Sequence, residues 1–169
     1  MAKESIVKNY ILNTTYQILN LLAPLVTTPY IARVLGADGV GVYSYTASVV
    51  AFFSIFAVLG TTTYGQQIIA QKRDDITERS KYFYEIEILS LITTFLSVLI
   101  WLGMLCLDSE YKTLFVILTL ELVAVGFDIS WFYSGLERFA YIVIPNMLIK
   151  IVSIVLLFVL VQDASDVGV

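Results

Sequence analysis

The chain has 169 residues, of which 59% are hydrophobic and 14% are charged, and its formal net charge is −4. A soluble domain carries about 25% charged residues, and one of this size cannot bury so much apolar side chain, so the composition predicts a membrane protein. The acidic balance without a basic cluster argues against a nucleic-acid partner, and the absence of histidine removes imidazole-based catalysis and most zinc sites, so we predict no catalytic residue, metal or cofactor.

Five apolar segments are each long enough to cross a bilayer as a helix, because about 20 helical residues cover the roughly 30 Å hydrocarbon core. They cover residues 10–34, 40–64, 83–106, 114–133 and 141–161. A transmembrane barrel would need alternating apolar and polar residues, which the run at 151–161 lacks. The sequence therefore predicts an all-α integral membrane protein, with a single partial transmembrane domain over residues 1–169.

The first segment contains Pro24 and Pro29. Each proline removes a backbone N–H and can kink a helix, which membrane proteins tolerate where neighbours or water satisfy the freed carbonyls. A static kink and a mobile bend are equally compatible with this pattern. The segment is about twice as long as the apolar part of a secretory signal, so we expect a membrane span and not a cleaved leader.

The second segment carries small residues four positions apart at Ser44, Ala47, Ser48 and Ala51. Small residues allow helix backbones to approach closely in a membrane. We interpret these four residues as a helix-packing seam that requires no ligand.

The third segment begins with Glu85 and Glu87 and ends at Cys106. The two acids are expected to reach the headgroup region, where water solvates them. Cys106 is the single cysteine, so no internal disulfide can form, and it is expected to behave as a small buried apolar residue.

Charges inside the fourth and fifth segments are the strongest signal, since each costs at least about 2.5 kcal/mol at the bilayer centre. Glu121 and Asp128 are seven residues apart, which places them on nearly the same face of a continuous helix. Lys150 lies in the fifth segment at a depth similar to that of Asp128, so we predict that these two face each other. A buried salt bridge and a role in substrate or ion handling both remain open.

Cation placement predicts the orientation. If the five segments cross the bilayer in turn, only Arg33 and Lys112 lie near one face of the membrane. Seven cations lie near the other face: Lys3, Lys8, Lys72, Arg73, Arg79, Lys81 and Arg138. The positive-inside rule then places the N-terminus and the longest polar link, residues 65–82, in the cytoplasm.

Residues 22–45 read LAPLVTTPYIARVLGADGVGVYSY, residues 60–75 read GTTTYGQQIIAQKRDD, and residues 128–150 read DISWFYSGLERFAYIVIPNMLIK. These three stretches resemble the polysaccharide-biosynthesis flippases, which transport O-antigen and capsule repeat units. In the first stretch Pro29, Arg33, Gly36, Gly39 and Gly41 stand at the relative positions usual for this group. The likeness covers nearly the whole chain.

The resemblance implies the multidrug/oligosaccharidyl-lipid/polysaccharide exporter fold, in which two helix bundles rock about a central cavity. The chain would supply most of the first bundle, and the second bundle would be absent. Members carry undecaprenyl-pyrophosphate-linked oligosaccharides from the cytoplasmic to the periplasmic leaflet of the bacterial inner membrane. The implied partners are this lipid-linked oligosaccharide, the lipid bilayer and other polysaccharide-assembly membrane proteins.

Candidate substrate contacts follow from a departure from the related lipid II flippases, which carry an Arg-Asp pair about seven residues before the position of Arg33. This sequence has Val26, Thr27 and Thr28 there. Phosphate contacts are therefore assigned to Arg33, Lys150 or the absent second half, and Glu121 and Asp128 are assigned to intramembrane charge or coupling.

Three alternative functions stay open. A small-molecule exporter of the same superfamily would differ in substrate. An integral-membrane enzyme of glycan assembly would need larger external loops and a catalytic constellation. A helper subunit without transport of its own is compatible with the length of the chain.

Overall fold

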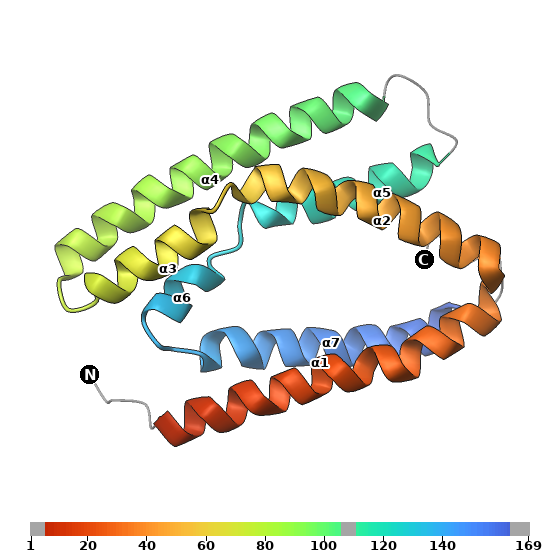
Figure 1. Ribbon diagram of the computed structural model, residues 1–169, viewed down its shortest axis with the longest axis horizontal. Helices are drawn as coiled ribbons and strands as arrows, with labels where there is room; N and C mark the ends of the chain where they lie inside the picture. Colours follow the sequence, from red (N-terminus) through yellow and green to blue (C-terminus); the bar gives the residue numbers. More distant parts are fainter. Residues whose placement is uncertain (1–5, 106–110, 163–169) are drawn as a thin grey trace. The chain divides into compact units, whose positions relative to one another are not determined.

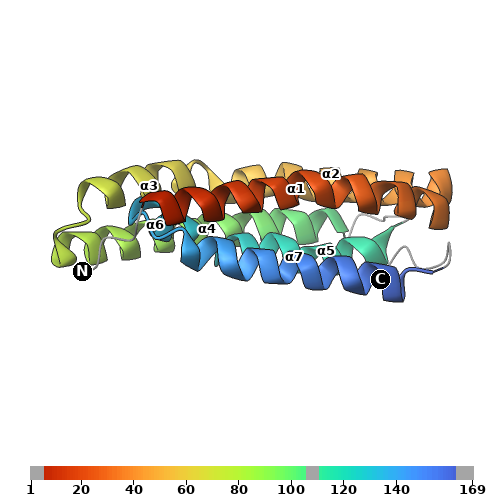
Figure 2. The ribbon, with the colours of Figure 1, turned by 90° about the horizontal axis from the view of Figure 1, so that it is seen from below.

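The computed structural model describes residues 6–105 and 111–162, and every regular element within these ranges is an α-helix (Figures 1 and 2). The helices are α1 (Ile6–Val34), α2 (Gly36–Val58), α3 (Thr61–Gln71), α4 (Ile76–Leu105), α5 (Lys112–Val125), α6 (Ser130–Gly135) and α7 (Ala140–Leu160). The predicted all-α class is confirmed. Cys106 lies outside the described residues.

Four described segments are long and apolar enough to cross a membrane: Gly36–Val58, Ile76–Leu105, Lys112–Gly135 and Ala140–Leu160. The helix α1 is longer than three of them, at 29 residues, but it does not reach the same hydropathy. Its N-terminal half carries Asn13, Gln17 and Asn20, which lower the mean. The count of five spans therefore stays a prediction.

The second predicted segment ends earlier than residue 64. The helix α2 stops at Val58, and Leu59 and Gly60 adopt left-handed backbone angles with φ of 39° and 77° before α3 begins. The predicted polar link at 65–82 is therefore mostly helical. Hydropathy alone predicted a link instead of a helix here, because α3 is polar except for a narrow face on which Gly65 and Ile69 are buried.

The fourth predicted segment is broken. The helix α5 ends at Val125 and α6 begins at Ser130, so Glu121 and Asp128 do not share one continuous helical face. The carboxylate of Asp128 accepts a hydrogen bond from the backbone N–H of Ser130 at 2.9 Å. Short acidic side chains that bind nearby backbone donors favour turns over helix, and Gly126 at the start of the break adds to this preference.

The chain divides into two compact units, which are described separately. The α1/α7 unit lies within Met1–Gly41 and Arg138–Val169, and the α2–α6 unit is Val42–Glu137. The prediction of a single partial domain is not decided by this division.

In the α1/α7 unit the two helices run parallel, side by side (Figures 1 and 2). The Tyr30 hydroxyl donates to the carbonyl oxygen of Val161 at 2.7 Å, and the Tyr30 ring packs on Phe158 with centroids 4.5 Å apart. Nearer the N-terminal ends of both helices, Lys150 contacts Asn20. Both contacts advance in the same direction along each helix, as expected of two parallel helices.

In the α2–α6 unit, α4 presents one buried face to its neighbours. That face consists of Ile86, Ser90, Thr94, Ser97, Trp101 and Leu105. Trp101 and Leu105 join residues of α2 and α5 in one apolar core, whereas Ile86 joins Ile69 and Trp131 in a second core. Small hydroxyl side chains separate the two cores.

Side-chain hydrogen bonds tie α4 to the helices beside it. Ser97 donates to the carbonyl of Phe53 at 2.9 Å, and the Trp101 indole N–H donates to the Thr119 hydroxyl at 2.9 Å. The face of α2 that packs here carries Thr46, Val50 and Ala57, which are fully buried. The predicted seam differs, because Ser44, Ser48 and Ala51 are exposed in the structure.

The helices α3 and α6 meet through glycines. A Cβ at Gly65 would lie 2.5 Å from the Trp131 ring, and one at Gly135 would lie 2.8 Å from the carbonyl oxygen of Gln66. A larger residue at Gly65 would displace the Trp131 ring, and one at Gly135 would displace the backbone of α3.

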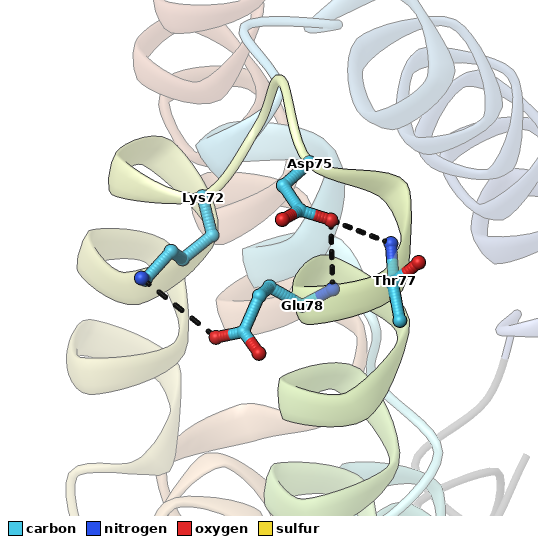
Figure 3. A network of polar contacts seen from close by, with 4 residues as sticks. All are labelled: Lys72, Asp75, Thr77 and Glu78. Atoms are coloured by element: carbon cyan, nitrogen blue, oxygen red, sulfur yellow. Dashed lines mark hydrogen bonds and ion pairs between the residues drawn. The ribbon is translucent and has the colours of Figure 1, made fainter.

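Asp75 organises the turn between α3 and α4 (Figure 3). Its carboxylate accepts from the backbone N–H groups of Thr77 and Glu78 at 2.9 and 3.1 Å, which satisfies two donors at the start of α4. Lys72 forms a longer ion pair with Glu78, at 3.7 Å.

Candidate functional site

A groove of about 240 Å³ lies between α1 and α7. It is lined by Ala23, Pro24, Thr27, Lys150, Ser153, Ile154 and Leu157. It lies along two long helices, of which α7 is apolar enough to cross a membrane, and this position makes it the strongest candidate site in the described part of the chain.

Lys150 is the charged residue of this groove. It is half-buried in α7, and its ammonium group donates to the side-chain oxygen of Asn20 at 2.6 Å. Asn20 is neutral and accepts one of three ammonium hydrogens, so the contact positions the cation and leaves its charge in place. A lysine held in this way can bind an anionic or hydroxyl-rich ligand.

The surroundings of Lys150 are polar on one side of each helix. On α1 the residues Asn13, Gln17 and Asn20 recur at spacings of four and three, and on α7 Asn146 and Lys150 are four apart. Gln17 and Asn146 are exposed. Hydrocarbon cannot satisfy such groups, so this face is suited to water, ligand or other protein.

Pro24 increases the polarity of the groove. Proline has no N–H, so the backbone carbonyl of Asn20 lacks its usual helical donor. The Thr27 hydroxyl donates to the carbonyl of Ala23 at 3.0 Å, one turn further along. Despite Pro24 and Pro29, α1 is continuous from Ile6 to Val34.

The other predicted site residues lie elsewhere. Arg33 is exposed in the last turn of α1 and does not line the groove. Glu121 is exposed on α5, and Asp128 is exposed in the break that follows. Asp128 and Lys150 belong to different units, so their pairing stays a prediction, as do the roles of all four residues.

Two features were missed by the sequence reasoning. Asn20 was not considered, although polar residues on one face of an apolar helix could have indicated it. Glu87 was expected to be solvated in the headgroup region, but one of its carboxylate oxygens is buried without a hydrogen-bond partner among the described residues. Glu87 is also close enough to Asp128 for their charges to interact.

The described residues contain no group of three or more His, Cys, Asp or Glu side chains that could hold a metal ion. The site's chemistry is that of charge and hydrogen bonding around one cation.

The chain matches the family described as polysaccharide biosynthesis protein over residues 6–167. It belongs to this polysaccharide biosynthesis family. Two relatives of this chain are each described as a candidate O-antigen transporter. One, from Escherichia coli strain K12, is 24% identical over 99% of this chain, and the other, from Shigella dysenteriae, is 24% identical over 95%. The chain spans 41% of the length of each relative. No solved structure matches it significantly.

Together with the apolar helices of the chain, this family membership indicates a multi-pass bacterial membrane protein.

Proposed function

We propose that the family member forms part of a flippase that moves undecaprenyl-pyrophosphate-linked oligosaccharide repeat units from the cytoplasmic to the periplasmic leaflet of the inner membrane. Transport would occur by alternating access and would serve O-antigen, capsule or exopolysaccharide synthesis. The observation that carries the proposal is the polar groove of the α1/α7 unit, where Lys150 is held by a neutral partner inside an apolar helix.

The physical need for such a groove follows from the substrate. A pyrophosphate that bears sugars cannot enter hydrocarbon, because unpaired charges and hydroxyl groups are very costly to bury. A flippase must replace the lost water with donors and cations. Lys150 supplies a cation for the phosphates, while Asn20, Thr27 and Ser153 supply groups that bind hydroxyls.

The same proposal includes a fold and an orientation. The described helices would form most of the first of two bundles, with the N-terminus and the α3–α4 turn in the cytoplasm, because most cations lie on that side. Asp74→Cys, combined with Cys106→Ala so that it is the only cysteine, tests the orientation, since this exposed residue lies beside the capping residue Asp75 and leaves the cap intact. We expect an impermeant thiol reagent to label it only after the inner membrane is opened. Labelling in intact spheroplasts would show that the protein has the opposite orientation.

Leaflet exchange tests the function directly. The complete gene product is reconstituted in liposomes that contain a fluorescent lipid-linked oligosaccharide, and an impermeant quencher reports which leaflet holds the label. We expect Lys150→Gln to slow exchange by about tenfold, the equivalent of about 1.4 kcal/mol, and Lys150→Arg to retain part of the rate. Lys112→Gln, the same change at an exposed lysine outside the groove, is the matched control.

The outcomes separate the alternatives. Exchange that is unaffected by Lys150→Gln would remove the groove from the mechanism. A wild-type protein that exports small cationic dyes and never exchanges the lipid-linked sugar would be a small-molecule exporter instead.

A further inference from the structure

A second pocket, of about 210 Å³, lies within the α2–α6 unit beside the first turns of α4 and α6. It is lined by Arg79, Ser80, Phe83, Tyr84, Ile129, Phe132 and Tyr133. None of these residues belongs to the groove between α1 and α7.

The pocket lies at the end of α4 that extends out of the hydrocarbon. A helix of 30 residues is about 45 Å long, which exceeds the roughly 30 Å core by about ten residues. All charged residues of α4 lie in its first twelve positions: Glu78, Arg79, Lys81, Glu85 and Glu87. This end, with the pocket, is therefore placed in the headgroup region.

The aromatic wall of the pocket is rigidly held. The rings of Phe83 and Phe132 lie 4.9 Å apart in an edge-to-face arrangement, and Phe83 stacks on the buried Trp131 at 5.7 Å. Trp131 is in turn fixed against Gly65 of α3. Rings that are locked by packing lose little entropy when a ligand binds to them.

Polar groups surround this wall. The Arg79 guanidinium donates to the carbonyl of Arg73 at 3.0 Å, which holds it at the pocket while its other N–H groups can serve a ligand. The side chains of Ser80 and Tyr84 are exposed and bring hydroxyl groups. Apolar rings bordered by hydroxyls and one guanidinium suit a pyranose, whose C–H face packs on an aromatic ring while its hydroxyls form hydrogen bonds.

We propose that this pocket binds one sugar ring of the lipid-linked glycan in the cytoplasmic headgroup region, before the glycan enters the transport path. The inference rests on the proposed function and orientation. The volume is below the roughly 300–1,000 Å³ of pockets for larger ligands, so it accommodates a single ring and not a whole repeat unit. A glycerophosphate headgroup would use the guanidinium alone and would leave the aromatic wall without a role.

Saturation-transfer NMR tests the pocket by itself. The full chain is placed in phosphatidylcholine nanodiscs, without sugar-based detergent, and is titrated separately with glucose, galactose, rhamnose, N-acetylglucosamine and glycerol 1-phosphate. We expect transfer to at least one sugar, and we expect Tyr84→Ala and Arg79→Gln each to weaken its binding by at least about threefold, as the loss of a hydrogen bond implies. Tyr43→Ala, at a similarly exposed tyrosine of α2, is the control.

Each result decides the proposal. Sugar signals that are absent, or that persist unchanged in both Tyr84→Ala and Arg79→Gln, would overturn it. A signal from glycerol 1-phosphate alone, dependent on Arg79, would show a lipid-headgroup site and would also overturn it. Tyr84→Phe, which removes only a hydroxyl, and circular dichroism of each variant guard against misfolding.

Leaflet exchange by the same variants, measured in liposomes, keeps the two proposals apart. Exchange without sugar transfer overturns the pocket and leaves the flippase intact. Sugar transfer at the pocket in a protein that never exchanges lipid-linked glycan supports the sugar site and overturns the flippase.

Discussion

The two units of the chain are built by opposite means. The α2–α6 unit buries large rings such as Trp101 and Trp131 in two cores. In the α1/α7 unit the buried apolar side chains are small: Ala23, Val143 and Val161. One unit therefore depends on close packing, whereas the other keeps polar groups accessible along its helices.

This difference indicates that stability depends mainly on the α2–α6 unit and transport mainly on the α1/α7 unit. Close packing leaves no room for a ligand inside the two cores, and an open polar groove contributes little packing energy. Substitutions in the α2–α6 unit should therefore reduce stability first, and those in the groove should reduce transport first. Four predictions test this contrast, all measured as the free energy of unfolding in mixed micelles.

The largest effect is expected at the glycine contacts between α3 and α6. Gly135→Ala places a methyl group 2.8 Å from the carbonyl of Gln66, and Gly65→Val drives a larger side chain into Trp131. Overpacking of this kind costs about 1–3 kcal/mol or more, and here a backbone atom cannot give way. Gly103→Ala is the control, because its Cβ meets no atom within 4 Å. Equal stability of Gly135→Ala and Gly103→Ala would refute the tight contact.

The next effect is expected at the hydrogen bond between α4 and α5. Thr119→Val keeps the side-chain shape but leaves the indole N–H of the buried Trp101 without its acceptor. Hydrogen bonds between membrane helices contribute about 0.6–1.7 kcal/mol, so we expect a loss in that range. Thr113→Val, at an exposed position of the same helix, should be neutral. A neutral Thr119→Val would mean that the two cores alone hold the helices.

A comparable effect is expected at the turn of Figure 3, where two polar contacts differ in kind. Asp75→Ala removes the acceptor for two backbone donors and should cost about 1 kcal/mol. Lys72→Gln removes a 3.7 Å ion pair whose side chains are about 40% exposed, and should cost less than about 0.5 kcal/mol. A larger loss for Lys72→Gln would reverse this ranking.

The smallest effect on stability is expected in the groove. Asn20→Leu removes the acceptor for Lys150 in a half-open site, and a change outside a packed core usually stays within about 0.5 kcal/mol. Leaflet exchange should nevertheless fall, because the cation is no longer positioned. If Asn20→Leu unfolded the protein as readily as Gly135→Ala, the groove would be a packing element and the contrast between the units would fail.

The amino-acid sequence by itself determined the class of the protein and most of its helices. Long apolar runs such as 141–161 can satisfy their backbone in lipid only as helices, so composition was sufficient. The sequence also indicated Lys150 as unusual, since a lone cation in such a run is costly. The motif around Pro29 and Arg33 pointed to the family that the comparison then established.

Only the tertiary structure decided where the helices break and which residues meet. The contact between α3 and α6 depends on Gly65 and Gly135, which let the two helices approach, and a glycine in a sequence does not reveal its neighbour. The partner of Lys150 was likewise hidden, because Asn20 lies 130 residues away along the chain. Hydropathy is a property of each segment alone, whereas contacts between distant segments depend on how their faces pack, and that is settled only when the chain folds.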